Sequence, residues 1–125
     1  MILVDTSVWI DHLRNGNSDL AALLDQNNVV MHPMIVGELA CGNLKNRTEL
    51  LRLWQSLVSI PTASHEEVLY FIDQHELMGK GIGYIDVHLL AAVILKAGTT
   101  LWTRDKRLAQ IAGKLGCAWS EPSNE

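Results

Sequence analysis

Short apolar segments that alternate with helical segments are the feature that most constrains the fold of this chain. Four segments have the character of strands: residues 2–5, 28–32, 99–103 and 117–119. They are mostly apolar and show little alternation with polar residues, as expected for strands covered on both faces. Because helical segments separate them, these strands are expected to run parallel. The sequence therefore predicts an α/β fold with a central parallel sheet.

Helices are expected at residues 7–14, 18–26, 34–43, 47–57, 65–78, 84–97 and 105–115. Two of these segments begin with the spacing of a capping box, Asn46 with Glu49 and Ser64 with Glu67. Gly98 follows the most apolar of them and is expected to end it. The resulting order of elements leaves no linker, repeat or low-complexity stretch between the strands.

Length and composition indicate a single globular domain spanning residues 1–125, since 48% of the residues are hydrophobic and 19% are charged. No apolar run reaches the roughly 18 residues that span a bilayer, and the N-terminus lacks the features of a secretory signal. Cys41 and Cys117 lie far apart and match no metal-ligand spacing. We therefore expect a reduced protein of the cytoplasm, with no membrane association.

The net charge of −4 argues against a general nucleic-acid binder, which usually has a basic excess. Basic residues nevertheless gather in two groups, Lys45, Arg47 and Arg52, and Arg104, Lys106 and Arg107. If several acids bind a cation in one pocket, the remaining surface is less acidic than the total suggests. For the second group, contact with phosphate and simple solvation of a helix start remain equally open.

Acids follow two of the predicted strands. Asp5 ends the first strand and Asp105 comes directly after the strand at residues 99–103. Because the carboxyl ends of parallel strands meet at one edge of a sheet, both side chains are expected at that edge, where ligands bind in α/β folds. Each acid also suits a helix N-cap, a common structural use of Asp.

Two further acids lie within predicted helices. Asp86 is in the first turn of its helix and heads an apolar face that continues through Leu89 and Val93. Glu38 shares a helix face with Ile35, so we expect it to be buried, although a side chain at the rim that reaches solvent is an equal alternative. Four carboxylates in one cleft repel each other unless a divalent cation neutralises them.

An oxygen-only set of ligands, without Cys or His, is typical of Mg²⁺ or Mn²⁺. Such an ion activates water and stabilises charge on a phosphoryl group. Ser7 and Thr103 lie at the two strand ends, where their hydroxyls are expected to orient the carboxylates or a bound water. The candidate site residues are thus Asp5, Glu38, Asp86 and Asp105, with Ser7 and Thr103 beside them.

Four segments that span most of the chain, ILVDTSVWIDHLR, HPMIVGELACGNL, GIGYIDVHLLAA and LWTRDKRL, contain these acids in order. With them the chain resembles the PIN-domain ribonucleases, most closely the VapC-type toxins of toxin–antitoxin pairs. The resemblance implies a three-layer α/β/α sandwich and RNA cleavage that depends on Mg²⁺ or Mn²⁺. Asp5 and Asp86 match the most consistent metal ligands of that family, Glu38 and Asp105 complete its acidic pocket, and Ser7 and Thr103 match its accessory hydroxyl positions.

The resemblance also implies partners: an RNA substrate, a small VapB-like antitoxin that blocks the pocket, and a second copy of the chain in a homodimer. One departure is His32-Pro33, where many relatives carry a hydroxyl residue near the entry to the Glu38 helix. The glycine-rich residues 79–83 lack the spacing of a phosphate-binding loop and predict a connection between helices.

Two other classes of function remain open on the residues alone. A receiver-like or phosphatase-like domain also places Asp at parallel strand ends. The phosphatase pattern needs a second Asp two residues after the first, where this chain has Ser7. A non-catalytic PIN-like binding module would keep the fold without the chemistry.

Overall fold

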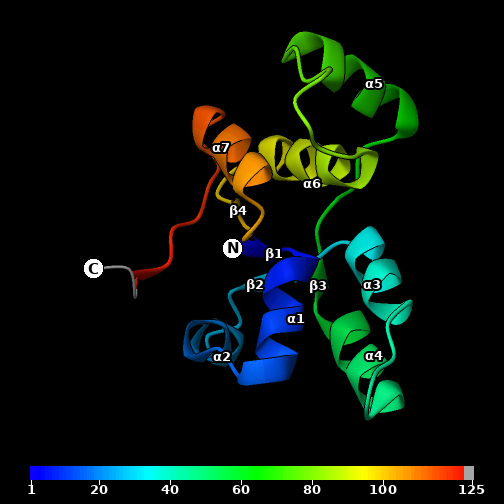
Figure 1. Cartoon of the computed structure of the whole chain (residues 1–125), viewed down its shortest axis with the longest axis vertical. Helices are drawn as coiled ribbons and strands as arrows, with labels where there is room; N and C mark the ends of the chain where they lie inside the picture. Colours follow the sequence, from blue (N-terminus) through cyan, green and yellow to red (C-terminus); the bar gives the residue numbers. More distant parts are fainter. Residues whose placement is uncertain (123–125) are drawn as a thin grey trace.

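The computed structural model describes residues 1–122, and its centre is a sheet of four parallel strands (Figure 1). The strands are β1 (Ile2–Val4), β2 (Val29–Met31), β3 (Val58–Ser59) and β4 (Thr100–Trp102), in the order β3-β2-β1-β4. The central strand β1 pairs with β2 on one side and with β4 on the other. The predicted parallel sheet is confirmed.

Helices connect and cover these strands: α1 (Thr6–Asn15), α2 (Ser18–Asp25), α3 (Pro33–Ala40), α4 (Arg47–Ser56), α5 (His65–Gln74), α6 (Tyr84–Leu95) and α7 (Lys106–Lys114). In Figure 1 α5, α6 and α7 lie toward one end of the molecule, and α1, α2 and α4 toward the other. Helix α6 packs against both α5 and β4, and α3 packs against both α1 and α4. None of the helices in residues 1–122 is long and apolar enough to cross a bilayer.

Burial follows the apolar pattern of the sequence. Every residue of β1 and β2 is buried, and α6 is buried continuously from Val87 to Val93. Trp9, Trp54 and Trp102 are almost completely buried and belong to the core. The rings of Trp9 and Trp54 meet edge to face at 5.9 Å, an arrangement that aromatic pairs favour. This core holds the strand ends that carry the acids.

Three local expectations were wrong. The edge strand β3 was not predicted, because its two residues are exposed and lack the apolar character of the other strands. The strand expected at residues 117–119 is only an isolated bridge between Leu101 and Ala118. Asn46 adopts a left-handed conformation (φ 55°) and makes no capping bond with its side chain, whereas the Ser64–Glu67 capping box is present.

Candidate active site

Asp5 is the most enclosed of the four acids, with 7% of its surface exposed. It follows β1 and caps α1, because its Oδ1 accepts a hydrogen bond from the Thr6 backbone N–H at 2.8 Å. Its Oδ2 accepts two more, from Ser7 Oγ at 3.1 Å and from Thr103 Oγ1 at 2.7 Å. The Asp5 carboxylate therefore caps α1 with one oxygen and is held in place through the other, by the two predicted hydroxyls of Ser7 and Thr103.

The same two hydroxyls also fix the loop that follows β4. Ser7 Oγ accepts a hydrogen bond from the Arg104 backbone N–H at 3.1 Å, and Thr103 Oγ1 accepts one from the Asp105 backbone N–H at 3.1 Å. Asp105 then caps α7, since its Oδ1 accepts from the Leu108 N–H at 2.9 Å. The ends of β1 and β4 are thus joined side to side, and the side chain of Asp105 remains exposed at this edge.

Asp86 lies half-buried in the first turn of α6, as predicted. Its Oδ2 accepts a hydrogen bond from the Gly83 backbone N–H at 3.1 Å. Burial raises the pKa of Asp86, the negative charges of Asp5 and Asp105 raise it further, and the bond from Gly83 opposes them. The charges of Asp5 and Asp105, from separate parts of the chain, therefore lie close enough to disfavour the ionised form of Asp86.

Glu38 is exposed, so the expectation of burial was wrong and the alternative of a rim position is the observed one. Helix α3 buries Ile35 and Leu39, and Glu38 lies beside that stripe rather than within it. Its Oε1 accepts a hydrogen bond from Thr6 Oγ1 at 3.0 Å, which connects it to the residue that follows Asp5. Thr6 was missed by the sequence analysis, although a hydroxyl directly after a strand-ending acid was a usable signal.

The acids lie near one another, but their carboxylates do not meet at a single position. Within residues 1–122, no three His, Cys, Asp or Glu side chains come together closely enough to bind one metal ion in the conformation observed. The ion pairs of that part of the chain both involve Arg104, with Asp11 and with Glu121, so none neutralises the four candidate acids. All-oxygen donors without a basic counterion fit a hard divalent cation, and Glu38 and Asp105 are the exposed members of the set.

His32 occupies the position where the sequence departs from the resemblance. It caps α3, because its Nδ1 accepts a hydrogen bond from the Met34 N–H at 3.1 Å. Its Nε2 is buried without a hydrogen-bond partner in the described structure. Burial, together with the charge of His88, lowers the pKa of His32 to about 4. His32 is therefore a neutral, structural histidine at neutral pH.

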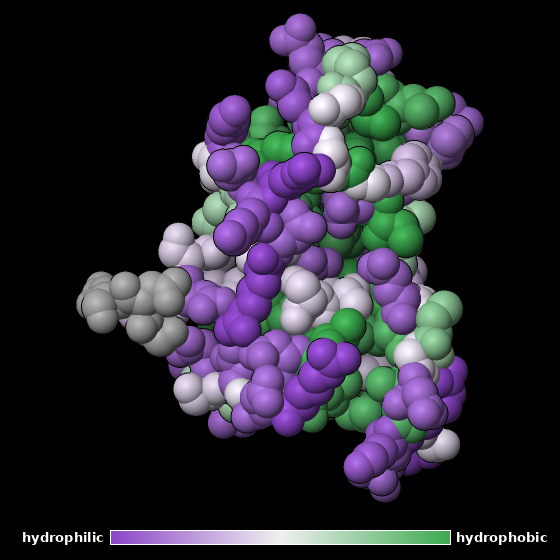
Figure 2. Space-filling view, in the orientation of Figure 1, coloured by the Kyte–Doolittle hydropathy of each residue, from purple (hydrophilic) through white to green (hydrophobic). Residues whose placement is uncertain are grey.

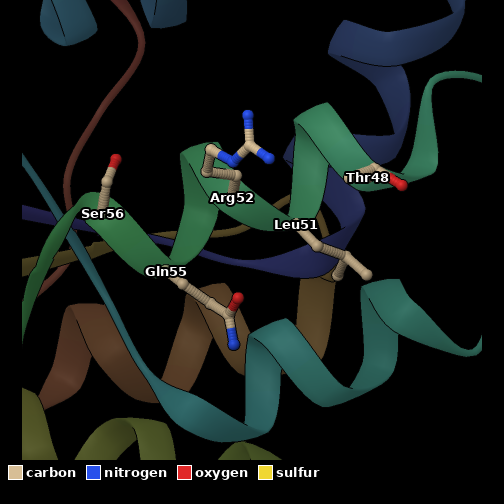
Figure 3. Close-up of a pocket in the computed structure, with 5 residues that line it drawn as sticks. All are labelled: Thr48, Leu51, Arg52, Gln55 and Ser56. Carbon is tan, nitrogen blue, oxygen red and sulfur yellow. The ribbon is translucent and has the colours of Figure 1, made fainter.

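Of the basic residues at positions 104–107, Arg104 forms ion pairs with Asp11 at 2.7 Å and with Glu121 at 3.1 Å, so its guanidinium is bound within the fold. The other basic group, Lys45, Arg47 and Arg52, lies on and near α4, where Arg52 lines a shallow pocket with Thr48, Leu51, Gln55 and Ser56 (Figure 3). That pocket contains none of the four acids.

Comparison with known proteins agrees with this geometry. A family model described as PIN domain matches residues 2–114. Ribonuclease VapC32 of Mycobacterium tuberculosis, in strains H37Rv and CDC 1551, is 44% identical over 121 residues, which cover 97% of this chain and 98% of the relative. The crystal structure of FitAcB from Neisseria gonorrhoeae superimposes over the whole of both chains with a TM-score of 0.64 and 24% identity, which supports the fold. The chain belongs to the PIN-domain family, among the VapC-type ribonucleases.

Proposed function

We propose that the chain is the toxin of a toxin–antitoxin pair and that it cleaves RNA phosphodiesters with Mg²⁺ or Mn²⁺ bound at Asp5, Glu38, Asp86 and Asp105. The observation that carries this proposal is the Asp86 carboxyl, whose pKa is raised by burial and by the charges of Asp5 and Asp105. Groups whose pKa is shifted by burial and by neighbouring charges are concentrated at functional sites. The identity to a ribonuclease over nearly the whole chain supports RNA as the substrate.

The chain's own residues divide the work. A divalent ion at this edge would lower the pKa of a bound water and stabilise negative charge on the phosphoryl group. Ser7 and Thr103 hold the Asp5 carboxylate in one orientation, so that the acid needs little rearrangement when it binds the ion. The Gly83 N–H favours the ionised form of Asp86 and fixes its direction. Glu38 and Asp105, on the exposed side, complete the set and face the incoming substrate.

The phosphoryl-acceptor alternative finds little support. The phosphatase pattern needs a second Asp two residues after the first, and that position is Ser7, whose hydroxyl donates a hydrogen bond to Asp5. The family match likewise favours the nuclease.

The partners follow from the same proposal. The edge of the sheet that carries Asp5, Glu38, Asp86 and Asp105 is called the acidic edge below. We infer a small VapB-like antitoxin that blocks the acidic edge, a cytoplasmic location shared with the RNA, and one PIN domain that accounts for residues 1–125. A homodimer is supported by exposed apolar side chains on α5 and α6, including Leu69, Tyr70 and Leu95. Figure 2 shows hydrophobic residues at the end of the molecule where α5 lies. Light scattering of the purified chain tests the dimer, and co-purification tests the antitoxin.

The central test is RNA cleavage by the purified chain with Mg²⁺, with Mn²⁺ and with a chelator. Asp5→Asn and Asp86→Asn are expected to abolish metal-dependent cleavage, because each removes a charged ligand. Asp25→Asn is the matched control, since Asp25 is an exposed acid at the end of α2. Equal cleavage by Asp86→Asn and Asp25→Asn would refute the proposal.

A further inference from the structure

Arg107 lies directly across the backbone of Gly81, a residue from a distant part of the chain. A Cβ atom built on Gly81 would be 2.4 Å from Arg107 Nη1 and 2.9 Å from its Cδ, closer than real contacts allow. Gly81 also has a φ of +81°, which favours glycine. The position therefore suits glycine for two reasons, and one of them is the space that the guanidinium occupies.

This contact joins the two segments that carry exposed parts of the acidic edge. Arg107 is in the first turn of α7, two residues after Asp105. Gly81 is two residues before Gly83, whose N–H binds Asp86. The Arg107 side chain thus crosses from the Asp105 segment to the Asp86 segment. It is held at the border of the site and not at an arbitrary place on the surface.

The charge of Arg107 is available for a ligand. Of the basic residues near Asp105, Arg104 is engaged by Asp11 and Glu121, whereas Arg107 takes part in no ion pair within residues 1–122. A guanidinium presents several N–H donors in a planar fork that fits phosphate oxygens.

We propose that Arg107 binds a backbone phosphate of the RNA substrate beside the acidic edge, and that Gly81 is the gap that lets its side chain lie there. This inference rests on the proposed function for the identity of the substrate. A phosphate is favoured over a base because the group is a fixed positive charge next to repelling carboxylates. The negatively charged RNA needs such a positive charge in order to approach the carboxylates. Contact with the backbone positions the strand without reading its sequence.

Binding is tested apart from cleavage. The full-length chain carrying Asp86→Asn is titrated with a labelled 20-nucleotide single-stranded RNA of random sequence in Mg²⁺, and fluorescence anisotropy is followed at several salt concentrations. Arg107→Ala is expected to weaken binding about 10-fold and to reduce the slope of log K against log salt by about 0.7. Arg52→Ala, at the exposed Arg in Figure 3, is the matched control and should leave both unchanged. Equal effects of the two arginine variants would overturn the proposal.

A pair of glycine variants tests the role of the gap. Gly79 and Gly81 both have positive φ, +71° and +81°, but a Cβ on Gly79 would meet nothing within 4 Å. Gly79→Ala and Gly81→Ala therefore impose the same kind of backbone strain, and only the second displaces Arg107. Gly81→Ala is expected to weaken RNA binding as Arg107→Ala does, and to add nothing in an Arg107→Ala background. If both glycine variants bind RNA alike, the inference is wrong.

The outcomes separate this inference from the proposed function. RNA binding that depends on Arg107, in a chain that cleaves no RNA under any metal condition, would support the contact and contradict the nuclease. Normal cleavage, with binding that does not depend on Arg107, would support the nuclease and overturn the contact. Arg107→Ala that weakens capture of the co-expressed antitoxin but leaves RNA binding intact would also overturn it.

Discussion

The Oγ1 of Thr103 donates a 2.7 Å hydrogen bond to Oδ2 of Asp5, although the two residues are 98 positions apart. The bond exists because β1 and β4 are parallel neighbours, with Val4 paired to Trp102. β1 ends one residue before Asp5, and β4 ends one residue before Thr103. The acid and the hydroxyl that orients it are therefore placed by strand pairing.

Replacing this hydroxyl should damage both activity and stability. Thr103→Val keeps the shape but removes the donor to Asp5 and the acceptor for the Asp105 N–H. We expect RNA cleavage or metal affinity to fall about 10–100-fold, as for other residues that orient metal ligands. Stability should fall by about 1–3 kcal/mol in urea denaturation, because a buried polar group loses its partner. Thr103→Ser should restore most of both, and a Ser variant as poor as Val would contradict this assignment.

Asp86→Asn should stabilise the protein at neutral pH while it inactivates the enzyme. The raised pKa of Asp86 means that the native state binds a proton more readily than the unfolded chain, so the ionised group lowers stability as pH rises above the ordinary carboxyl range. The Asn amide oxygen can still accept the Gly83 hydrogen bond. Thermal unfolding without metal should show a Tm a few degrees above wild type at pH 7 and little difference near pH 3.

Mg²⁺ or Mn²⁺ provides the complementary check on Asp86. An ion that binds the native acids and not the unfolded chain raises the Tm of the wild type. The Asp86→Asn variant should gain much less from the same ion. A wild-type Tm that is unchanged by millimolar Mg²⁺ and Mn²⁺ would argue against metal binding at this edge.

His32 should make the fold sensitive to mild acid. Its pKa is lowered from 6.5 to about 4, so the native state resists protonation more than the unfolded chain does. The stability from neutral His32 is complete above about pH 6.5 and is lost as pH falls toward 4, on the order of 2–3 kcal/mol. Urea denaturation at pH 7 and pH 4.5 measures this loss. His32→Asn, which keeps a capping side chain, should lose less stability between pH 7 and pH 4.5 than the wild type. His75→Gln, at an exposed position, should lose as much as the wild type.

Glu121 should contribute to stability through the segment that follows α7. Its Oε1 accepts hydrogen bonds from Trp102 Nε1 at 2.8 Å and from Arg104 Nε at 3.1 Å. Trp102 is buried, so Glu121→Ala leaves an indole N–H without its partner and should cost about 1–3 kcal/mol in chemical denaturation. Glu121→Gln retains an acceptor oxygen and should cost less. Equal stability of the Ala variant and the wild type would show that water replaces the carboxylate.

The sequence predicted the elements whose local chemistry is unambiguous. The apolar strands β1, β2 and β4 and the Ser64–Glu67 capping box follow from patterns within a few residues. It missed β3, whose two exposed residues join the sheet only by pairing with β2. It also misplaced Glu38, because a short helix shares its apolar stripe among residues whose exposure depends on what packs against them.

For the candidate site, the sequence by itself determined which residues have the right chemistry and which strand ends carry Asp5 and Asp105. Periodicity was enough to place Asp86 at the start of a buried helix. Only the tertiary structure decided that Thr103 binds Asp5, that Thr6 binds Glu38 and that Arg107 lies over Gly81. These contacts join residues far apart in the chain. A local pattern reports the face on which a side chain lies, but its partner is set by how whole elements pack together.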